Sequence, residues 1–212
     1  MKNYFSDCNC NADSSTSLQC DANGICTCKD GFTGNTCNEF GPILFPTGFS
    51  QKGIVPTFQN NMVHSIPVYG PEFYVEFNVR ILRYPLVEWT NLLHVTYGDN
   101  SGVHGTRFPG VWLNINKSFH FATTLDTESN YVHTFSGVAL NHDYHMIISQ
   151  QFNAENQLIY SITIDGQLSN SVQNNNAITI SPALLYLSDP WYASIGDVGE
   201  LSNVQVMSGK PN

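Results

Sequence analysis

The six cysteines, all between Cys8 and Cys37, are the residues whose types and spacing point most clearly to chemistry. Thiols in such a block can hold a metal, exchange electrons or form structural disulfides. Zinc sites prefer C-x2-C pairs with histidine partners, and the first forty residues contain no histidine. A thioredoxin-like motif needs C-x-x-C, whereas both close pairs, Cys8 with Cys10 and Cys26 with Cys28, are C-x-C. We therefore expect these thiols to be disulfide staples.

Paired carboxylates are the next candidate, because two acids flanking a glycosidic bond can hydrolyse it. Glu72 and Glu76 are separated by apolar or aromatic residues, and Asp126 with Glu128 is a single pair in a loop-like stretch. Neither matches the alternating acids that glucanases carry on one strand. There is no G-x-S-x-G, and every cysteine belongs to the N-terminal block. We expect no enzyme activity, and a glucanase-like hydrolase is the least favoured interpretation.

Length and composition predict two domains of unequal size. The 212 residues are 42% hydrophobic, which is enough to bury one sizeable core. The cysteine-dense part has few core-forming residues and must depend on its bridges. We expect a small module at residues 1–40, a linker or first sandwich strand at 41–64, and a large domain at 65–212.

Charge and cysteine usage limit the partners and the compartment. The formal net charge is −9 with no Lys/Arg cluster, so we expect no nucleic-acid partner, and no apolar run is long enough for a membrane span. Disulfides persist in oxidising compartments, so the protein is expected to be extracellular. The start MKNYFSDCNC lacks a signal peptide, which predicts one segment of a longer secreted product. The sequon at Asn116 is either glycosylated or a chance match.

The remaining chain is predicted to be an all-β sandwich, because short runs of alternating apolar and polar residues are separated by turn residues. No stretch is long enough and free enough of turn residues for a helix. The expected strands are 73–82, 89–97, 110–115, 118–123, 131–135, 145–152, 157–164, 177–180 and 204–207.

The N-terminal block closely resembles an EGF-like domain in the stretch CTCKDGFTGNTC, where Gly31, Phe32 and Gly34 occupy the family's C-terminal signature. The C-x-C at Cys8 and Cys10 is similar to the laminin and tenascin kinds. The resemblance implies the pairs Cys8 with Cys20, Cys10 with Cys26, and Cys28 with Cys37. Cysteine spacing alone leaves fifteen pairings open for six cysteines.

The large domain resembles a laminin-G or concanavalin A-like jelly roll in LLHVTYGDN, GVWLNINKSFHFATT, VALNHDYHMIISQQ, IYSITIDGQ and LYLSDPWYASIGDVGELSNVQV. In many laminin-G domains a calcium ion lies at one rim. The resemblance implies that Asp126 and either Ser188 or Asp189 would hold it, with Ca²⁺ as the possible cofactor. The alternative is that Asp126 caps a turn and Asp189 precedes Pro190 in another turn, and both interpretations stay open.

His142 and His145 flank Asp143 and Tyr144, which is one further arrangement that could hold a metal. The jelly-roll resemblance places a turn and then a strand start at this point. That placement favours His145 as a half-buried strand residue.

Glycan recognition needs exposed aromatic rings beside side chains that hydrogen-bond hydroxyls. Trp191 and Tyr192 are expected in a loop next to Asp189, and Tyr131 follows Asn130. Arg107, in a long Gly-rich loop, could face an acidic partner or orient the loop. Trp89 and Trp112 alternate with apolar residues, which favours a place in the core.

Together these patterns predict a non-enzymatic extracellular adhesion or matrix segment. It would bind a glycan or an extracellular protein through sandwich rim loops, with or without calcium. The alternative is a self-associating subunit of an extracellular filament or coat, and the low charge, at 12% of residues, permits both.

Overall fold

The computed structural model describes residues 9–12, 15–21, 23–29, 32–40, 48–126 and 128–209. Contacts divide the chain into two compact units, residues 1–46 and 47–212, and each unit is described by itself. No described helix is both long enough and apolar enough to cross a membrane.

The N-terminal unit consists of two small antiparallel ribbons. Strand β1 (Ser15–Cys20) pairs with β2 (Cys26–Cys28), and β3 (Phe32–Thr33) pairs with β4 (Glu39–Phe40). Asp21 closes the turn between β1 and β2, because its carboxylate accepts the backbone N–H groups of Asn23 and Ile25 at 2.9 Å each. These two hydrogen bonds, that from Ile25 first, lower the pKa of Asp21.

Disulfides hold these ribbons together. Cys10 is bonded to Cys26, and Cys28 is bonded to Cys37. These are two of the three pairs that the EGF resemblance implies. Cys20 is also disulfide-bonded, whereas Cys8 lies outside the described residues.

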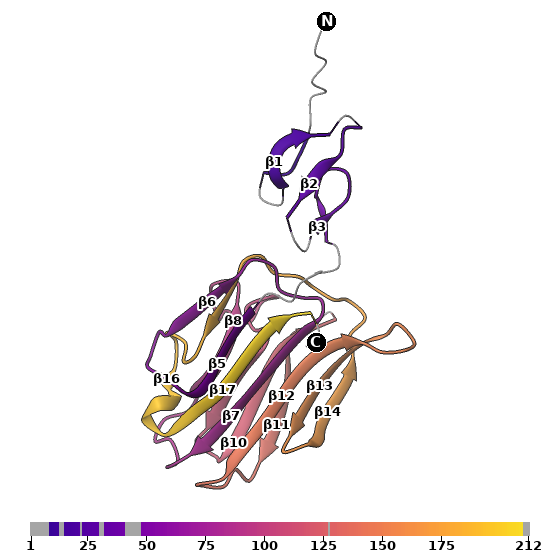
Figure 1. The fold of residues 1–212 in the computed structure, drawn as a ribbon. Coiled ribbons are helices and arrows are strands. Elements are labelled where there is room, and N and C mark those ends of the chain that lie inside the picture. The colour runs from indigo at the N-terminus through magenta and orange to yellow at the C-terminus, as the bar shows by residue number, and fades with distance from the viewer. Residues whose placement is uncertain are drawn as a thin grey trace, which may run out of the picture. The chain divides into compact units, whose positions relative to one another are not determined.

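The C-terminal unit is an antiparallel β-sandwich (Figure 1), which confirms the predicted fold class. One sheet has six strands in the order β14-β13-β12-β7-β17-β5, and the other follows the order β11-β10-β9-β8-β15-β6, with β16 added beside β8. The strands of the first sheet are β5 (Gly48–Val55), β7 (Phe73–Ile81), β12 (Asp143–Phe152), β13 (Leu158–Ile164), β14 (Gln167–Gln173) and β17 (Gly199–Ser208). Those of the second are β6 (Met62–Ile66), β8 (Thr90–Thr96), β9 (Gly110–Asn114), β10 (Ser118–Leu125), β11 (Glu128–Ser136), β15 (Ala183–Tyr186) and β16 (Ala193–Ser194).

Strict alternation within the strands builds the core between the two sheets. In β7, FYVEFNVRI, the odd-numbered residues from Phe73 to Ile81 are buried, and Phe73 and Phe77 are fully buried. Because successive side chains of a strand point to opposite faces, the intervening residues of β7 lie on the face away from the core. The same rule in β9 and β10 places polar and aromatic residues on the outer face of the seven-stranded sheet.

The predicted strands differ from the observed ones in places. The prediction of a strand at 177–180 is wrong. Of these residues, Ile180 alone pairs with another segment, through an isolated β-bridge to Tyr69. Strands β14 and β15 were not expected. The segment 41–64 was expected to be a linker or the first sandwich strand; its described part contains β5 and the start of β6, which continues to Ile66.

Candidate ligand-binding site

Trp112 forms the centre of an aromatic cluster on the outer face of the seven-stranded sheet. Its neighbours in β9, Val111 and Leu113, point into the core, so Trp112 points outward. The strand register places it opposite His120 of β10.

Gly110 makes room for the Trp112 ring, which folds back along its own strand. A Cβ atom built on Gly110 would lie only 2.1 Å from Cη2 of Trp112. Three other rings make edge-to-face contacts with the indole, with centroids 5.2 Å away for His94, 5.8 Å for Tyr192 and 6.1 Å for His120. The indole N–H of Trp112 is buried and has no hydrogen-bond partner among the described residues.

A fully buried pair, His94 and Asp189, fixes the loops around this cluster. Nδ1 of His94 lies 2.9 Å from Oδ2 of Asp189, and Nε2 lies 2.6 Å from the carbonyl oxygen of Thr106. A carbonyl oxygen only accepts, so Nε2 carries a proton, and a second proton lies between Nδ1 and the carboxylate. The other carboxylate oxygen accepts the backbone N–H groups of Trp191 (3.1 Å) and Tyr192 (3.0 Å). The pair thus connects the segment before β9 with the segment that carries the two loop aromatics.

A chain of polar side chains runs beside the aromatic rings. Nε of Arg107 donates to Oδ1 of Asn100 at 2.8 Å, and Nη1 donates to Oδ1 of Asn130 at 2.6 Å. Asn100 in turn donates to the hydroxyl of Tyr192 at 2.8 Å. The guanidinium carbon of Arg107 lies 5.4 Å from the Trp112 ring centroid, within the range of a cation–π contact.

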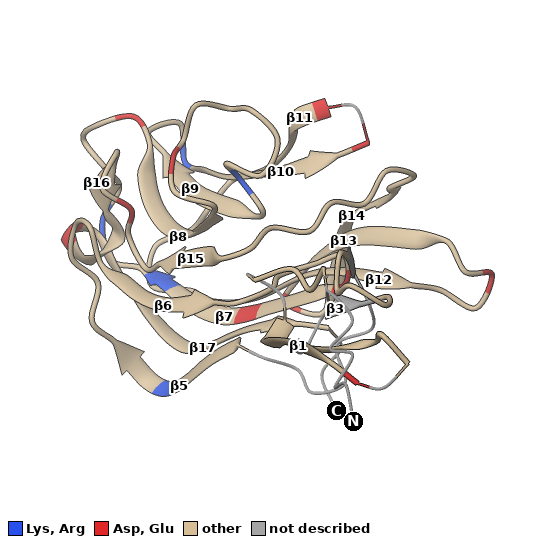
Figure 2. Cartoon of the chain, turned by 90° about the horizontal axis from the view of Figure 1, so that it is seen from above, with Lys and Arg blue, Asp and Glu red and all other residues tan. Residues whose placement is uncertain are grey.

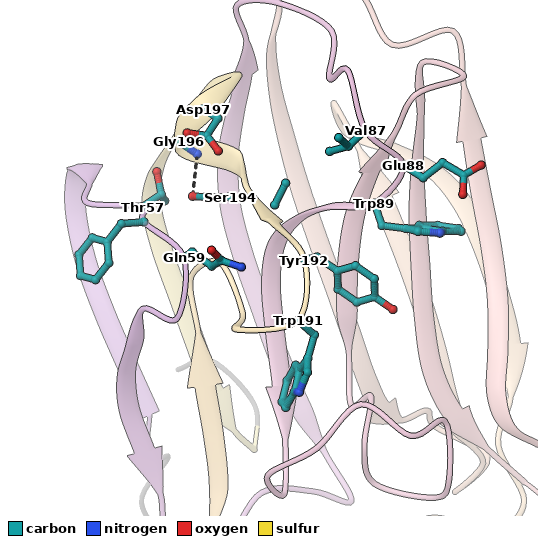
Figure 3. Close-up of a pocket in the computed structure, with 12 residues that line it drawn as sticks. Thr57, Gln59, Val87, Glu88, Trp89, Trp191, Tyr192, Ser194, Gly196 and Asp197 are labelled. Atoms are coloured by element: carbon teal, nitrogen blue, oxygen red, sulfur yellow. Dashed lines mark hydrogen bonds between the residues drawn. The ribbon is translucent and has the colours of Figure 1, made fainter.

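These residues line two adjoining pockets. The smaller, the Arg107 pocket, has a volume of about 270 Å³ and is lined by Trp89, Arg107, Trp112, His120, Asn130 and Tyr192. The larger, the Gln59 pocket, has a volume of about 710 Å³ and is lined by residues 57–59, 87–89, 191–194, 196 and 197. Both include Trp89 and Tyr192. Figure 3 shows the Tyr192 ring between the rings of Trp89 and Trp191, with Gln59 extending toward it.

Burial and one positive charge determine the electrostatics of the Arg107 pocket. Burial, and then the charge of Arg107, lower the pKa of His120, so His120 is neutral at pH 7. Figure 2 shows that Lys and Arg are scattered over the sandwich rather than gathered in a patch. Among the residues that line its pocket, Arg107 is the only one with a permanent charge, in a protein whose formal net charge is −9.

Three of the four predicted ligand-binding residues, Arg107, Trp191 and Tyr192, lie at these pockets. Tyr131 does not, because it packs against the core and its hydroxyl accepts a hydrogen bond from Nδ2 of Asn170 at 3.0 Å. The expectation that Trp89 packs in the core is wrong, since it is half-buried and lines both pockets.

Sequence reasoning missed Trp112, His120 and Asn100 as site residues, and it named Asn130 only as the neighbour of Tyr131. The alternation in GVWLN and SFHF carries a signal for two of them, because it places Trp112 and His120 on one face of the sheet. The sequence gives no comparable signal for Asn100.

The two aspartates expected at a calcium site make separate hydrogen-bond networks. Both oxygens of Asp189 face N–H donors, as described above. Asp126 accepts backbone N–H groups of Asn175 and Asn176 and the Asn175 side chain. Ser188 is buried, and its Oγ accepts from the Ser194 hydroxyl.

No group of three His, Cys, Asp or Glu within the described ranges is arranged to hold a metal. The calcium site on Asp126 and Asp189 stays a prediction. Calorimetry at millimolar calcium tests it, and a lack of binding heat would refute it.

The other candidate metal-binding residues, His142 and His145, lie beside and in β12 of the six-stranded sheet. Glu76 contacts Nε2 of His145 and the hydroxyl of Tyr74, both at 2.8 Å. His145 lies half-buried in β12, the place expected for it. His142 lies 2.7 Å from the carboxylate of Asp165, and the sequon residue Asn116 is exposed in the turn between β9 and β10.

Comparison with known proteins identifies the small unit. The family model for the laminin EGF domain matches residues 8–45. These residues are a laminin EGF domain. The match agrees with the disulfides of this unit and with the resemblance found in the sequence.

The sandwich is similar in fold to several solved structures. A heptameric SAP-like pentraxin from Limulus polyphemus has 11% identity and a TM-score of 0.47, with 71% of this chain and 73% of that chain covered. The CBM40 of a Ruminococcus gnavus IT-sialidase, bound to α2,3-sialyllactose, has 11% identity and a TM-score of 0.45, with 73% and 91% covered. A carbohydrate-binding module, CBM66, from Bacillus subtilis has 13% identity and a TM-score of 0.39, with 74% and 90% covered. At these identities and TM-scores, the similarity does not indicate what this chain binds. No curated protein matches the chain.

Proposed function

We propose that the sandwich binds carbohydrate in the Arg107 and Gln59 pockets, and that the chain is a non-enzymatic binding segment. The observation that carries this proposal is the convergence of all three tryptophans and Tyr192 on one face of one sheet. Their rings lie beside amide and guanidinium groups. The pair His94 and Asp189 holds the loop that supplies two of them.

This combination suits sugars for a physical reason. The C–H faces of a sugar ring pack on aromatic rings, while its hydroxyls need donors and acceptors placed around the edge. Arg107, Asn130, Gln59 and Glu88 supply those groups. The two pocket volumes, about 270 and 710 Å³, would accept one sugar ring and a short oligosaccharide respectively.

The proposed place of action is outside the cell. A laminin EGF domain with disulfide bonds supports it, since disulfides form and persist in oxidising compartments. Binding of an extracellular glycan in these pockets would fit an adhesion or matrix role.

A matched pair of tyrosine variants tests the site. Tyr192→Phe removes the hydroxyl that Asn100 bonds at the pocket, and Tyr131→Phe removes the hydroxyl that Asn170 bonds against the core. For a sugar selected on a glycan array, we expect Tyr192→Phe to weaken binding about fivefold or more in calorimetry and Tyr131→Phe to leave it unchanged. Equal effects would contradict the site. An empty array with ordered association in light scattering would favour the self-associating subunit instead.

A further inference from the structure

Arg107 has no counter-charge in its pocket. The other residues lining the pocket are Trp89, Trp112, His120, Asn130 and Tyr192, none of which is acidic. Within the described residues, Arg107 makes no ion pair, and its two hydrogen bonds go to neutral amide oxygens.

Among the described residues, the guanidinium of Arg107 keeps donors without a partner in a fixed orientation. Five N–H groups form its planar fork, and two of them are used by Asn100 and Asn130. Those two bonds and the Trp112 ring beneath hold the fork in place. A carboxylate can accept two charge-assisted hydrogen bonds from such a fork. Because the Arg107 side chain is already held in place, this binding would order it little further.

The two pockets also differ in the charges of the residues that line them. The Gln59 pocket includes Glu88 and Asp197, which disfavour an anion there. The aromatic walls, with Trp112 buried and Trp89 and Tyr192 half-buried, lower the local dielectric around Arg107 and strengthen its attraction for an anion.

We propose, resting on the carbohydrate-binding function above, that the Arg107 pocket takes the carboxylate of an acidic sugar, a uronic or sialic acid. The sugar ring would pack on Trp89 or Tyr192 while the carboxylate meets the guanidinium. Neutral sugars of the same glycan would extend toward the Gln59 pocket.

The test compares each acidic sugar with a neutral counterpart in which a hydroxymethyl group or a methyl ester replaces the carboxylate, measured by calorimetry on the full chain. The probes are methyl β-D-glucuronide with methyl β-D-glucoside, and methyl α-N-acetylneuraminide with its methyl ester. A short glutamate-rich peptide serves as a carboxylate without a sugar. We expect at least one acidic sugar to bind about tenfold or more tightly than its neutral counterpart and than the peptide, with weaker binding at high salt.

Variants assign the preference to Arg107. Arg107→Gln should abolish it, and Arg107→Lys should retain part of it because the charge stays while the fork is lost. Arg80→Gln is the matched control, since Arg80 pairs with Asp143 between β7 and β12 of the other sheet. Thermal unfolding checks that each variant is folded.

The outcomes separate this inference from the function on which it rests. Neutral sugars that bind as tightly as acidic ones, or a preference that survives in Arg107→Gln, would overturn the acidic-sugar assignment and leave carbohydrate binding intact. A peptide that binds as tightly as the acidic sugar would overturn the sugar class. If no acidic or neutral sugar bound, on the array or in solution, both proposals would fail.

Discussion

His94 and Asp189 are joined by a 2.9 Å contact in a fully buried place on the outer side of the seven-stranded sheet. Through its other oxygen, Asp189 accepts the backbone N–H groups of Trp191 and Tyr192. The pair positions the candidate site, because it fixes the backbone of the two pocket residues Trp191 and Tyr192.

Variants of Asp189 test whether its hydrogen bonds hold this loop in place. Asp189→Ala should lower the free energy of unfolding by about 3–5 kcal/mol, because it leaves buried N–H groups unpaired. Asp189→Asn should cost less, since a carboxamide oxygen can accept from Trp191 and Tyr192 while its NH₂ donates to neutral His94. Urea unfolding of both variants makes the comparison. Equal losses would show that hydrogen bonding at Asp189 is not what holds the loop.

Gly110→Ala tests how closely the Trp112 ring packs against the backbone of its own strand. The added methyl group would overlap a ring atom at 2.1 Å, so we expect a loss of about 1–3 kcal/mol and a changed near-UV circular dichroism spectrum. Replacing Trp112 by Leu in the same chain should relieve the overlap, so the double variant should lose less than the sum of the single ones. Additive losses would place the strain elsewhere.

His120 reports on the charge of Arg107. Its pKa is lowered by burial and then by Arg107, whereas the pKa of His133 is lowered by burial alone. In Arg107→Gln, an NMR titration should show the pKa of His120 rising toward, but not reaching, about 6.5, with His133 unchanged. A shift of both histidines, or of neither, would contradict this account.

The same lowered pKa predicts how stability depends on pH. Between the lowered value and about 6.5, the unfolded chain binds more protons at His120 than the folded chain does. This contribution to the free energy of unfolding is therefore complete above about pH 6.5 and is lost as the pH falls through that window. His120→Gln should make the slope shallower in urea unfolding at a series of pH values. An unchanged slope would rule out His120 as its source.

Reduction of the disulfides should unfold the N-terminal unit and leave the sandwich folded. All six cysteines lie in the first 37 residues, and all three tryptophans lie in the sandwich. Dithiothreitol should therefore unfold the laminin EGF domain, where each bridge contributes about 2–4 kcal/mol, and leave the tryptophan fluorescence unchanged. A red shift in that fluorescence on reduction would contradict independent stability of the sandwich.

Much of the fold could be predicted because local patterns determine it. The alternation of β7 and the turn Asp165-Gly166, where both residues have positive φ, are readable from residue types alone. The strand β14, QLSNSVQ, could not be recognised because it is polar and mostly exposed. Likewise, the alternation in β9 shows that Trp112 and Val111 face opposite ways, but not which face is the core.

The site was only partly predictable for a related reason. Loop aromatics next to an aspartate indicated Trp191 and Tyr192, which the structure places at the pockets. The long-range bonds of Arg107 to Asn130 and of Asp189 to His94 depend on tertiary contacts between distant segments. No local pattern contains that information.

The most direct test of the central claim is a glycan array of the full chain, wild type beside Trp191→Ala and Phe152→Ala. Trp191 and Phe152 are equally exposed, at 39%, but of the two only Trp191 is among the residues lining the Gln59 and Arg107 pockets. We predict that the wild type binds a defined set of glycans, that Trp191→Ala loses them, and that Phe152→Ala retains them. Binding that survives Trp191→Ala, or an array on which the wild type binds nothing, would contradict the account.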